Sequence, residues 1–199
     1  MLNLLFIPEI IISIGVMIII LFDLFFQKQK ALSFALVQFL LLIAAYYSLA
    51  DKSSSNYSAY TLNEFTNIFK FILLVGSLTI FHYTYKHLKF LKILKIEYFT
   101  ISLLGLIGTM IMISANSLLM LYLGIELLSL SLYALIGFNK KSSLSSEAAI
   151  KYYVLGAMSS GILLFGISLN CLAVSNHPNG LFLESAWVGS SDSDINVYR

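Results

Sequence analysis

A single carboxylate, Glu126, lies in the middle of a long apolar stretch of the sequence. It is the ninth residue of the apolar segment 118–138, and at the helical rise this places it about 13 Å deep, near the centre of a bilayer. A carboxylate at that depth is costly, and it usually faces protein or water. Glu126 is therefore a candidate for an ion pathway, with a structural carboxyl hydrogen-bonded between helices as the alternative.

Glu147 and Lys151 form a second acid–base combination. Their spacing of four residues puts both side chains on one face of a helix, with the acid before the base in the favourable order. Together with Glu126 they could make up a proton pathway. The pair could equally anchor a helix end at the membrane edge, with the lysine reaching toward water, and its spacing leaves both readings open.

Small residues recur at four-residue intervals in the last apolar segment. They form two overlapping patterns, Gly156 with Ser160 and Ala157 with Gly161. Small residues at this spacing let two helix backbones approach closely inside a membrane. We interpret them as a helix-packing surface.

Four lysines recur every three residues and alternate with apolar side chains: Lys86, Lys89, Lys92 and Lys95. Such a segment could lie at the membrane surface and contact anionic lipid head groups such as cardiolipin. A plain anchor on the positively charged side of the membrane explains the lysines more simply. Glu9 and Asp23, near opposite ends of the first apolar segment, are interpreted as interfacial.

The composition excludes a soluble domain. The chain of 199 residues is 59% hydrophobic and 11% charged, with a mean hydropathy of +0.88, whereas an ordinary soluble domain is about 25% charged. The single cysteine, Cys171, excludes a disulfide framework. No metal-ligand spacing or phosphate-binding loop is found, so we expect no metal, no cofactor bound by this chain and no nucleic-acid partner.

Six apolar segments are long enough to cross a bilayer as helices, which need about 20 residues each. The fold class predicted is therefore an all-α integral membrane protein. The predicted helices cover residues 4–26, 31–49, 68–85, 98–115, 118–138 and 148–173. The chain divides into a three-helix part with a basic loop, three further helices and an aqueous-side tail, at residues 1–96, 97–174 and 175–199.

The lysines predict the orientation of the chain. The loops after the first, third and fifth segments carry eight lysines, against two or three basic residues on the opposite side. Since positive loops stay on the cytoplasmic or matrix side, both termini are expected on the other side.

Residues 124–138 and 146–166 together resemble subunit 2 of NADH:ubiquinone oxidoreductase, respiratory complex I. The opening Ile7-Pro8-Glu9-Ile10 resembles the family's first helix more weakly. Related subunits 4 and 5 and the multisubunit cation/proton antiporters share the fold, but they usually have a proline soon after the glutamate of helix five. Here Glu126 is followed by Leu-Leu-Ser-Leu-Ser, which favours subunit 2.

The resemblance implies roles for the charged residues. Glu126 corresponds to a glutamate that pairs with a lysine of helix seven, and Glu147 and Lys151 correspond to an acid and a base at helix six. Such groups would pass protons across the membrane. The whole complex uses NAD, FMN, iron–sulfur clusters and ubiquinone, none of them on this chain. The implied partners are other membrane-arm subunits, especially antiporter-like subunit 4, and membrane lipids.

The resemblance reaches only the first six helices of the family's longer fold. Either a second polypeptide supplies helix seven onward, or the sequence is truncated. Two other functions remain open: a cation/proton antiporter subunit without redox coupling, and a structural scaffold without its own proton path. The amino-acid composition is of the type that AT-rich genomes encode. Together with the absence of a leader, it favours a mitochondrially encoded protein of the inner membrane, with both termini toward the intermembrane space.

Overall fold

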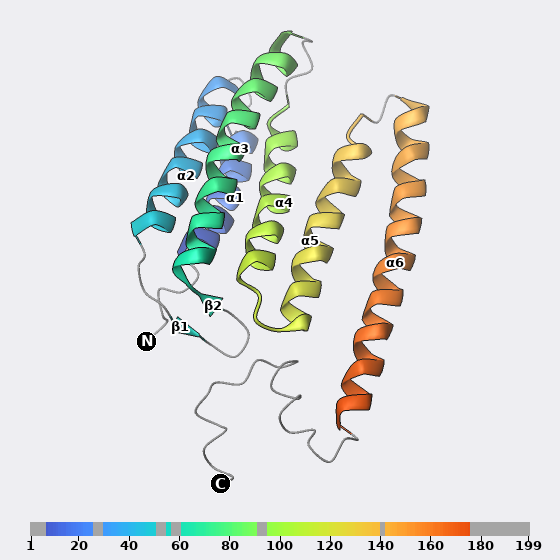
Figure 1. Ribbon diagram of the computed structural model, residues 1–199. Helices are drawn as coiled ribbons and strands as arrows, with labels where there is room; N and C mark the ends of the chain where they lie inside the picture. The colour runs from blue at the N-terminus through green and yellow to red at the C-terminus, as the bar shows by residue number, and fades with distance from the viewer. Residues whose placement is uncertain are drawn as a thin grey trace.

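A computed structural model describes residues 7–25, 30–50, 55–56, 61–90, 95–139 and 142–175. Within these ranges the chain forms six long helices and one short pair of strands (Figure 1). All six helices are long and apolar enough to cross a membrane, which confirms the predicted fold class. The helices are α1 (Ile7–Phe25), α2 (Lys30–Ala50), α3 (Glu64–Phe90), α4 (Ile96–Ser114), α5 (Leu118–Ile136) and α6 (Ser143–Ser175).

Two helices extend well beyond their apolar segments. Helix α3 is longer at both ends than the predicted 68–85, and α6 begins five residues before the predicted 148–173. Lys86 and Lys89, predicted in a basic loop, therefore lie on the last turns of α3. A helix does not end where the apolar residues end, because long lysine side chains can reach water from the last turns. The predicted tail beyond Ser175 lies outside the described residues.

A short antiparallel ribbon, which the sequence did not predict, precedes α3. Strand β1 (Ser55–Asn56) pairs with β2 (Thr61–Leu62), with Ser55 opposite Leu62. The hydroxyl of Thr66 accepts a hydrogen bond from the Asn63 amide at 3.0 Å and donates one to the Asn63 carbonyl at 2.8 Å. These bonds give partners to the N–H and C=O groups of Asn63 at the start of α3, where a helix leaves backbone groups unpaired.

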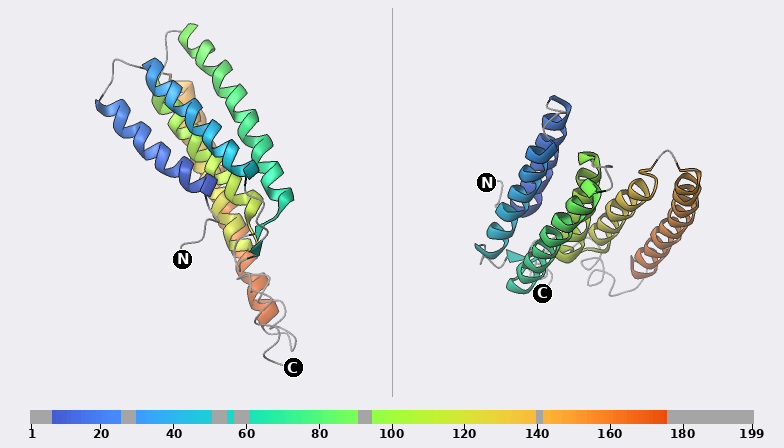
Figure 2. Two further views of the ribbon diagram at one scale, coloured as in Figure 1. Left: turned by 90° about the vertical axis from the view of Figure 1, so that its left-hand side faces the viewer. Right: turned by 90° about the horizontal axis from the view of Figure 1, so that it is seen from above.

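Helices α1 to α4 surround an apolar core (Figure 2). Both α1 and α3 pack against α2 and α4. Near one end of this group the ring of Phe34 stacks on Tyr85, with 3.9 Å between centroids, and meets Phe99 edge-on at 5.2 Å. Fully buried aliphatic side chains continue the core between the helices: Ile12, Val37, Leu41, Leu74, Leu103 and Met110.

Helices α4 and α5 form a tight antiparallel hairpin. Its short turn ends at Ser117, whose hydroxyl accepts a hydrogen bond from the Met120 amide and caps α5. The backbones touch at two glycines. A Cβ atom added to Gly108 would lie 2.9 Å from the Gly124 carbonyl oxygen, and one added to Gly124 would lie 3.0 Å from the Gly108 oxygen. Only glycine fits at these two positions.

Helix α6 packs against α5 at the edge of the molecule, so that α4, α5 and α6 follow one another in a row (Figures 1 and 2). None of its described side chains is buried, and its apolar residues are largely exposed. Exposed apolar surface of this extent is typical of a face that meets lipid or another protein.

Candidate functional site

Glu126 is the ninth residue of α5 and is half-buried. Its Oε2 atom is inaccessible to solvent and has no hydrogen-bond partner in the part of the chain that the structure describes. Buried polar atoms in folded proteins nearly always have a partner. A carboxylate oxygen in this state is ready to bind a cation, a proton donor or a water molecule from outside the described helices.

Glu126 faces away from α4. On α5, Gly124 and Ser131 contact α4, through Met112 and Gly105 respectively. Glu126 and Tyr133 are seven residues apart, so at about 100° per residue they share a face, on the opposite side of α5 from Gly124. Tyr133 contacts α6, which places the Glu126 carboxylate on the α6 side of its helix.

Tyr133 makes the contact between α5 and α6 that lies nearest to Glu126, and the Ser145 hydroxyl of α6 also donates a hydrogen bond to the Ile136 carbonyl at 2.6 Å. The Tyr133 hydroxyl lies against the backbone of Gly156, where a Cβ atom would overlap it. Its ring also meets Tyr152 and Tyr153 edge-on, with centroids 5.1 and 5.7 Å away. Tyr133 therefore helps to set the register in which the two helices pair.

Glu147 and Lys151 form the ion pair that their spacing predicted. The Lys151 Nζ atom lies 2.5 Å from Glu147 Oε1 on the early turns of α6. The side chain of Lys151 is 69% exposed and that of Glu147 is 59% exposed. The pair is thus open on the outer surface of the described helices.

The structure does not bring Glu126 and Lys151 together. Counted along the helix axes from the close approach of Gly137 to the Ala149 Cβ atom, Glu126 lies eleven residues, about 16.5 Å, toward one end of the molecule, and Lys151 lies two residues, about 3 Å, in the same direction. The two residues are therefore about 13 Å apart along the axes. No direct ion pair between them is possible, and a proton would need intermediate groups or water to pass from one to the other.

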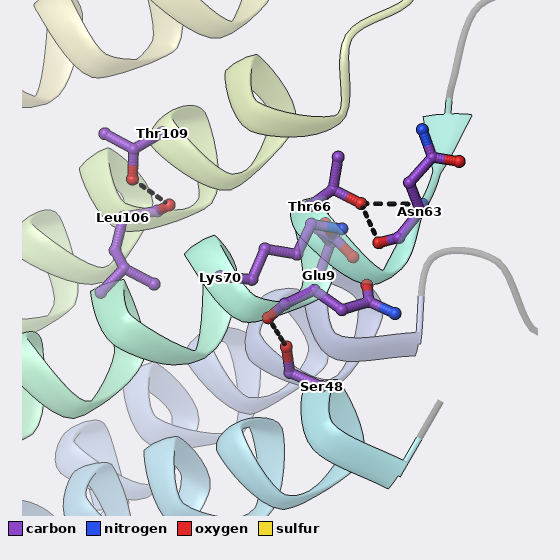
Figure 3. A network of polar contacts seen from close by, with 8 residues as sticks. Glu9, Ser48, Asn63, Thr66, Lys70, Leu106 and Thr109 are labelled. Carbon is purple, nitrogen blue, oxygen red and sulfur yellow. Dashed lines mark hydrogen bonds and ion pairs between the residues drawn. The ribbon is translucent and has the colours of Figure 1, made fainter. Parts of the chain in front are cut away.

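A third acid–base pair was missed by the sequence analysis. The Lys70 Nζ atom lies 2.6 Å from Glu9 Oε1, with side-chain exposures of 0% and 6%. Figure 3 shows the two residues side by side, near the hydrogen bond from the Ser48 hydroxyl to the Asn67 carbonyl at 3.0 Å. The interpretation of Glu9 as interfacial was wrong, because α1 presents it to the interior. Asp23, by contrast, is half-buried near the other end of α1.

One signal could have revealed this pair. Lys70 stands in a segment that is otherwise apolar, and charges inside a membrane segment usually pair with one another. Because α3 begins at Glu64, Lys70 lies in its second turn and not at its end.

The four small residues of α6 differ in the contacts that they make. Gly156 packs on Tyr133, whereas nothing lies within 4 Å of a Cβ atom placed on Gly161. Ala157 is exposed, and the Ser160 hydroxyl donates to the Ala157 carbonyl at 3.2 Å. The contact of Gly156 with Tyr133 joins α6 to α5, and a packing role for the other three small residues stays a prediction.

The basic residues near the α3–α4 connection are exposed where the structure describes them. Lys86 and Lys89 lie on the last turns of α3, and Lys95 precedes α4 with its Nζ atom 5.2 Å from the centre of the Phe138 ring. Lys92 lies outside the described residues. Their contact with lipid stays a prediction.

Comparison with known proteins adds sequence similarity to this geometry. Residues 115–176, which include α5 and α6, match the family model described as the transmembrane part of NADH:quinone oxidoreductase and Mrp antiporters. NADH-quinone oxidoreductase subunit N of Thioalkalivibrio sulfidiphilus is 39% identical over 82% of this chain and 35% of its own length. The subunit N of Ruthia magnifica is 37% identical over 81% of this chain and 34% of its own length.

A solved structure shows the same fold. A chain of respiratory complex I from Thermus thermophilus with bound aureothin matches with a TM-score of 0.64 and 22% identity, over 81% of this chain and 36% of that one. The chain therefore spans about a third of the length of the curated relatives and of the structure that it matches.

Proposed function

This chain is a homologue of NADH-quinone oxidoreductase subunit N, and from that premise we propose that it forms part of a membrane-arm subunit of a proton-translocating NADH:quinone oxidoreductase. NADH oxidation by FMN and iron–sulfur clusters and the reduction of ubiquinone take place on other subunits of such an enzyme. The contribution of this chain is to the movement of protons across the membrane.

The observation that carries the proposal is the state of Glu126. A buried carboxylate oxygen that has no hydrogen-bond partner among the described residues lies on a membrane helix, inside the region that matches the antiporter family model. Keeping such a group is costly unless it is paired. We propose that a lysine from a helix outside the described residues pairs with Glu126, and that changes in this pairing load and release a proton.

Glu147 and Lys151 form the second step of the proposed pathway. Their exposed ion pair can exchange protons with water or with an incoming side chain. The axial distance of about 13 Å from Glu126 requires a relay between the two sites. Hydroxyl groups on α6 or water between the helices would provide it.

The remaining helices are proposed to come from a second polypeptide. The exposed apolar surface of α6 supports further helices at this edge. The neighbours would be other membrane-arm subunits, among them antiporter-like subunit 4, together with lipid. Mass analysis of the purified complex should find a chain of 22.2 kDa beside a separate partner. A single longer chain with both parts would rule out the split.

The proposed location is the mitochondrial inner membrane, with both termini toward the intermembrane space. The distribution of lysines supports the orientation, because eight of them lie in connections or at helix ends on one side. The AT-rich type of composition supports a mitochondrial gene. The relatives named above are bacterial, so protease accessibility in isolated mitochondria is the direct test of location and orientation.

The function is tested by Glu126→Gln, which keeps the size of the side chain and removes its charge. We expect fewer protons pumped per NADH oxidised in the assembled complex. Glu64→Gln is the control, because Glu64 is an exposed acid in the first turn of α3. Unchanged pumping with intact assembly would contradict the proposal, and a loss confined to assembly would favour a scaffold role.

A second candidate is a cation/proton antiporter without redox coupling. The family model that matches this chain covers Mrp antiporters as well as the oxidoreductases. Loss of the chain separates the two functions. NADH oxidation by the membranes falls if the chain is part of the oxidoreductase, and only sodium/proton exchange falls if it is an antiporter subunit.

A further inference from the structure

A pocket of about 660 Å³ opens between the end of α1 and the beginning of α4. It does not include any residue of the proton pathway proposed above. The described residues that line it are Ile20, Asp23, Leu24, Lys95, Ile96, Glu97, Thr100, Ile101 and Leu104.

The charged residues of the pocket lie at the level of the helix ends. Asp23 is two residues before the end of α1, Lys95 directly precedes α4, and Glu97 is the second residue of α4. This end of the pocket therefore carries two carboxylates and one ammonium group. The Lys95 Nζ atom lies 5.2 Å from the centre of the Phe138 ring, which holds the ammonium group on the side of α5.

Apart from Thr100, whose hydroxyl donates a hydrogen bond to the Ile96 carbonyl, the remaining described lining residues are aliphatic, and they extend along the helices. Leu104 is eight residues into α4, which corresponds to a depth of about 12 Å. Ile20 and Leu24 of α1 lie on the other wall and are 47% and 66% exposed. A charged mouth at the helix ends and an apolar channel below it match a molecule that has a polar head and a hydrocarbon chain.

We propose that this pocket binds a phospholipid with a primary amine in its head group, of the phosphatidylethanolamine type. The lipid ammonium would lie between Asp23 and Glu97, the phosphate would lie toward Lys95, and an acyl chain would follow Ile101 and Leu104. Two acids against one base disfavour an anionic head group. A primary ammonium donates hydrogen bonds to both carboxylates, whereas the quaternary ammonium of choline has no hydrogen to donate.

This pocket is a different site from the series of lysines that begins at Lys86, for which the sequence predicted contact with anionic lipid such as cardiolipin. Lys86 and Lys89 are not among the described residues that line the pocket. The proposal does not depend on proton translocation by this chain, since it concerns the face of the bundle formed by α1 and α4.

Photolabelling of the purified complex tests the proposal. The complex is reconstituted in nanodiscs with phosphatidylethanolamine that carries a photoactivatable diazirine in its acyl chain, and the labelled peptides are mapped by mass spectrometry. We expect label on residues 20–24 and 97–104, and competition by unlabelled phosphatidylethanolamine but not by phosphatidylcholine. The variant Asp23→Asn with Glu97→Gln should lower the labelling about tenfold, because it removes both partners of the ammonium.

Two further variants make the result decisive. Glu64→Gln, an exposed acid at the opposite end of the bundle, should leave the labelling unchanged. Leu104→Trp fills the apolar part of the pocket and leaves all charges in place, so it should abolish labelling even if the double variant fails to assemble.

Three results would overturn the proposal. The first is equal competition by phosphatidylcholine, or stronger competition by cardiolipin. The second is wild-type labelling in the double variant or in Leu104→Trp. The third is a map of the complex in which a side chain from a neighbouring subunit fills the pocket.

Discussion

The Nζ atom of Lys70 on α3 lies 2.6 Å from Oε1 of Glu9 on α1, in the interior of the four-helix group. Both helices pack against α2 and α4, so the ion pair joins two helices that are otherwise linked mainly through their neighbours. Glu9 stands in the first turn of α1, where the helix dipole favours a negative charge. The pair therefore fixes the position of α1 relative to α3.

Removing one partner of this pair is expected to destabilise the bundle. Glu9→Gln or Lys70→Met alone removes one half of a buried ion pair, at a cost of about 3–5 kcal/mol. The double variant should recover part of this loss, because it removes both buried charges. Thermal unfolding and assembly yield of the complex measure the effect. Equal stability of the two single variants and of the wild type would show that the pair is not buried as the structure has it.

Alanine at Gly108 is expected to force α4 and α5 apart. Its Cβ atom would lie 2.8 Å from the Leu128 amide nitrogen and 2.9 Å from the Gly124 oxygen, and neither backbone atom can move aside easily. Overpacking of this kind costs about 1–3 kcal/mol. Gly76→Ala is the matched control, since nothing lies within 4 Å of its Cβ position. It should be neutral or slightly stabilising, because alanine favours a helix over glycine. Equal melting temperatures for the two variants would contradict the glycine contact.

Lys151→Met tests the exposed ion pair of α6. Exposed pairs of this kind contribute only about 0–1 kcal/mol to stability, so the amount of assembled complex should hardly change. If Lys151 passes protons, pumping per NADH should fall in this variant and also in Lys151→Arg, because a guanidinium group keeps the positive charge but does not release its proton. Unimpaired pumping in Lys151→Met would show that the pair only anchors the end of the helix.

Larger residues at Gly161 test whether another helix covers α6. Within the described residues its Cβ position is open, so leucine there should not disturb the packing of these six helices. If a partner helix approaches α6 closely, the series Ala, Val, Leu at Gly161 should weaken assembly progressively. Blue-native electrophoresis would report the loss. Full assembly with leucine would show that Gly161 faces lipid.

The sequence predicted the helices because each apolar segment must satisfy its own backbone hydrogen bonds in lipid. It also predicted the position of Glu126 as the ninth residue of its helix. It could not predict the pairing of Glu9 with Lys70, since that contact depends on how helix packing brings together two residues that are 61 positions apart in the chain. The separation of Glu126 from Lys151 likewise follows from the register of α5 and α6. That register depends on the contacts of Tyr133 with Gly156, of Gly137 with Ala149 and of Ile136 with Ser145, which no local pattern specifies.

The glycine contact between α4 and α5 also determines which parts of the molecule can move. With backbone against backbone at Gly108 and Gly124, there is no side chain whose rotamer could change to let one helix slide on the other. The contact between α5 and α6, by contrast, includes the side chain of Tyr133 and the hydrogen bond from the Ser145 hydroxyl to the Ile136 carbonyl. We therefore expect α4 and α5 to move as one unit, which keeps Glu126 at a fixed height relative to α4.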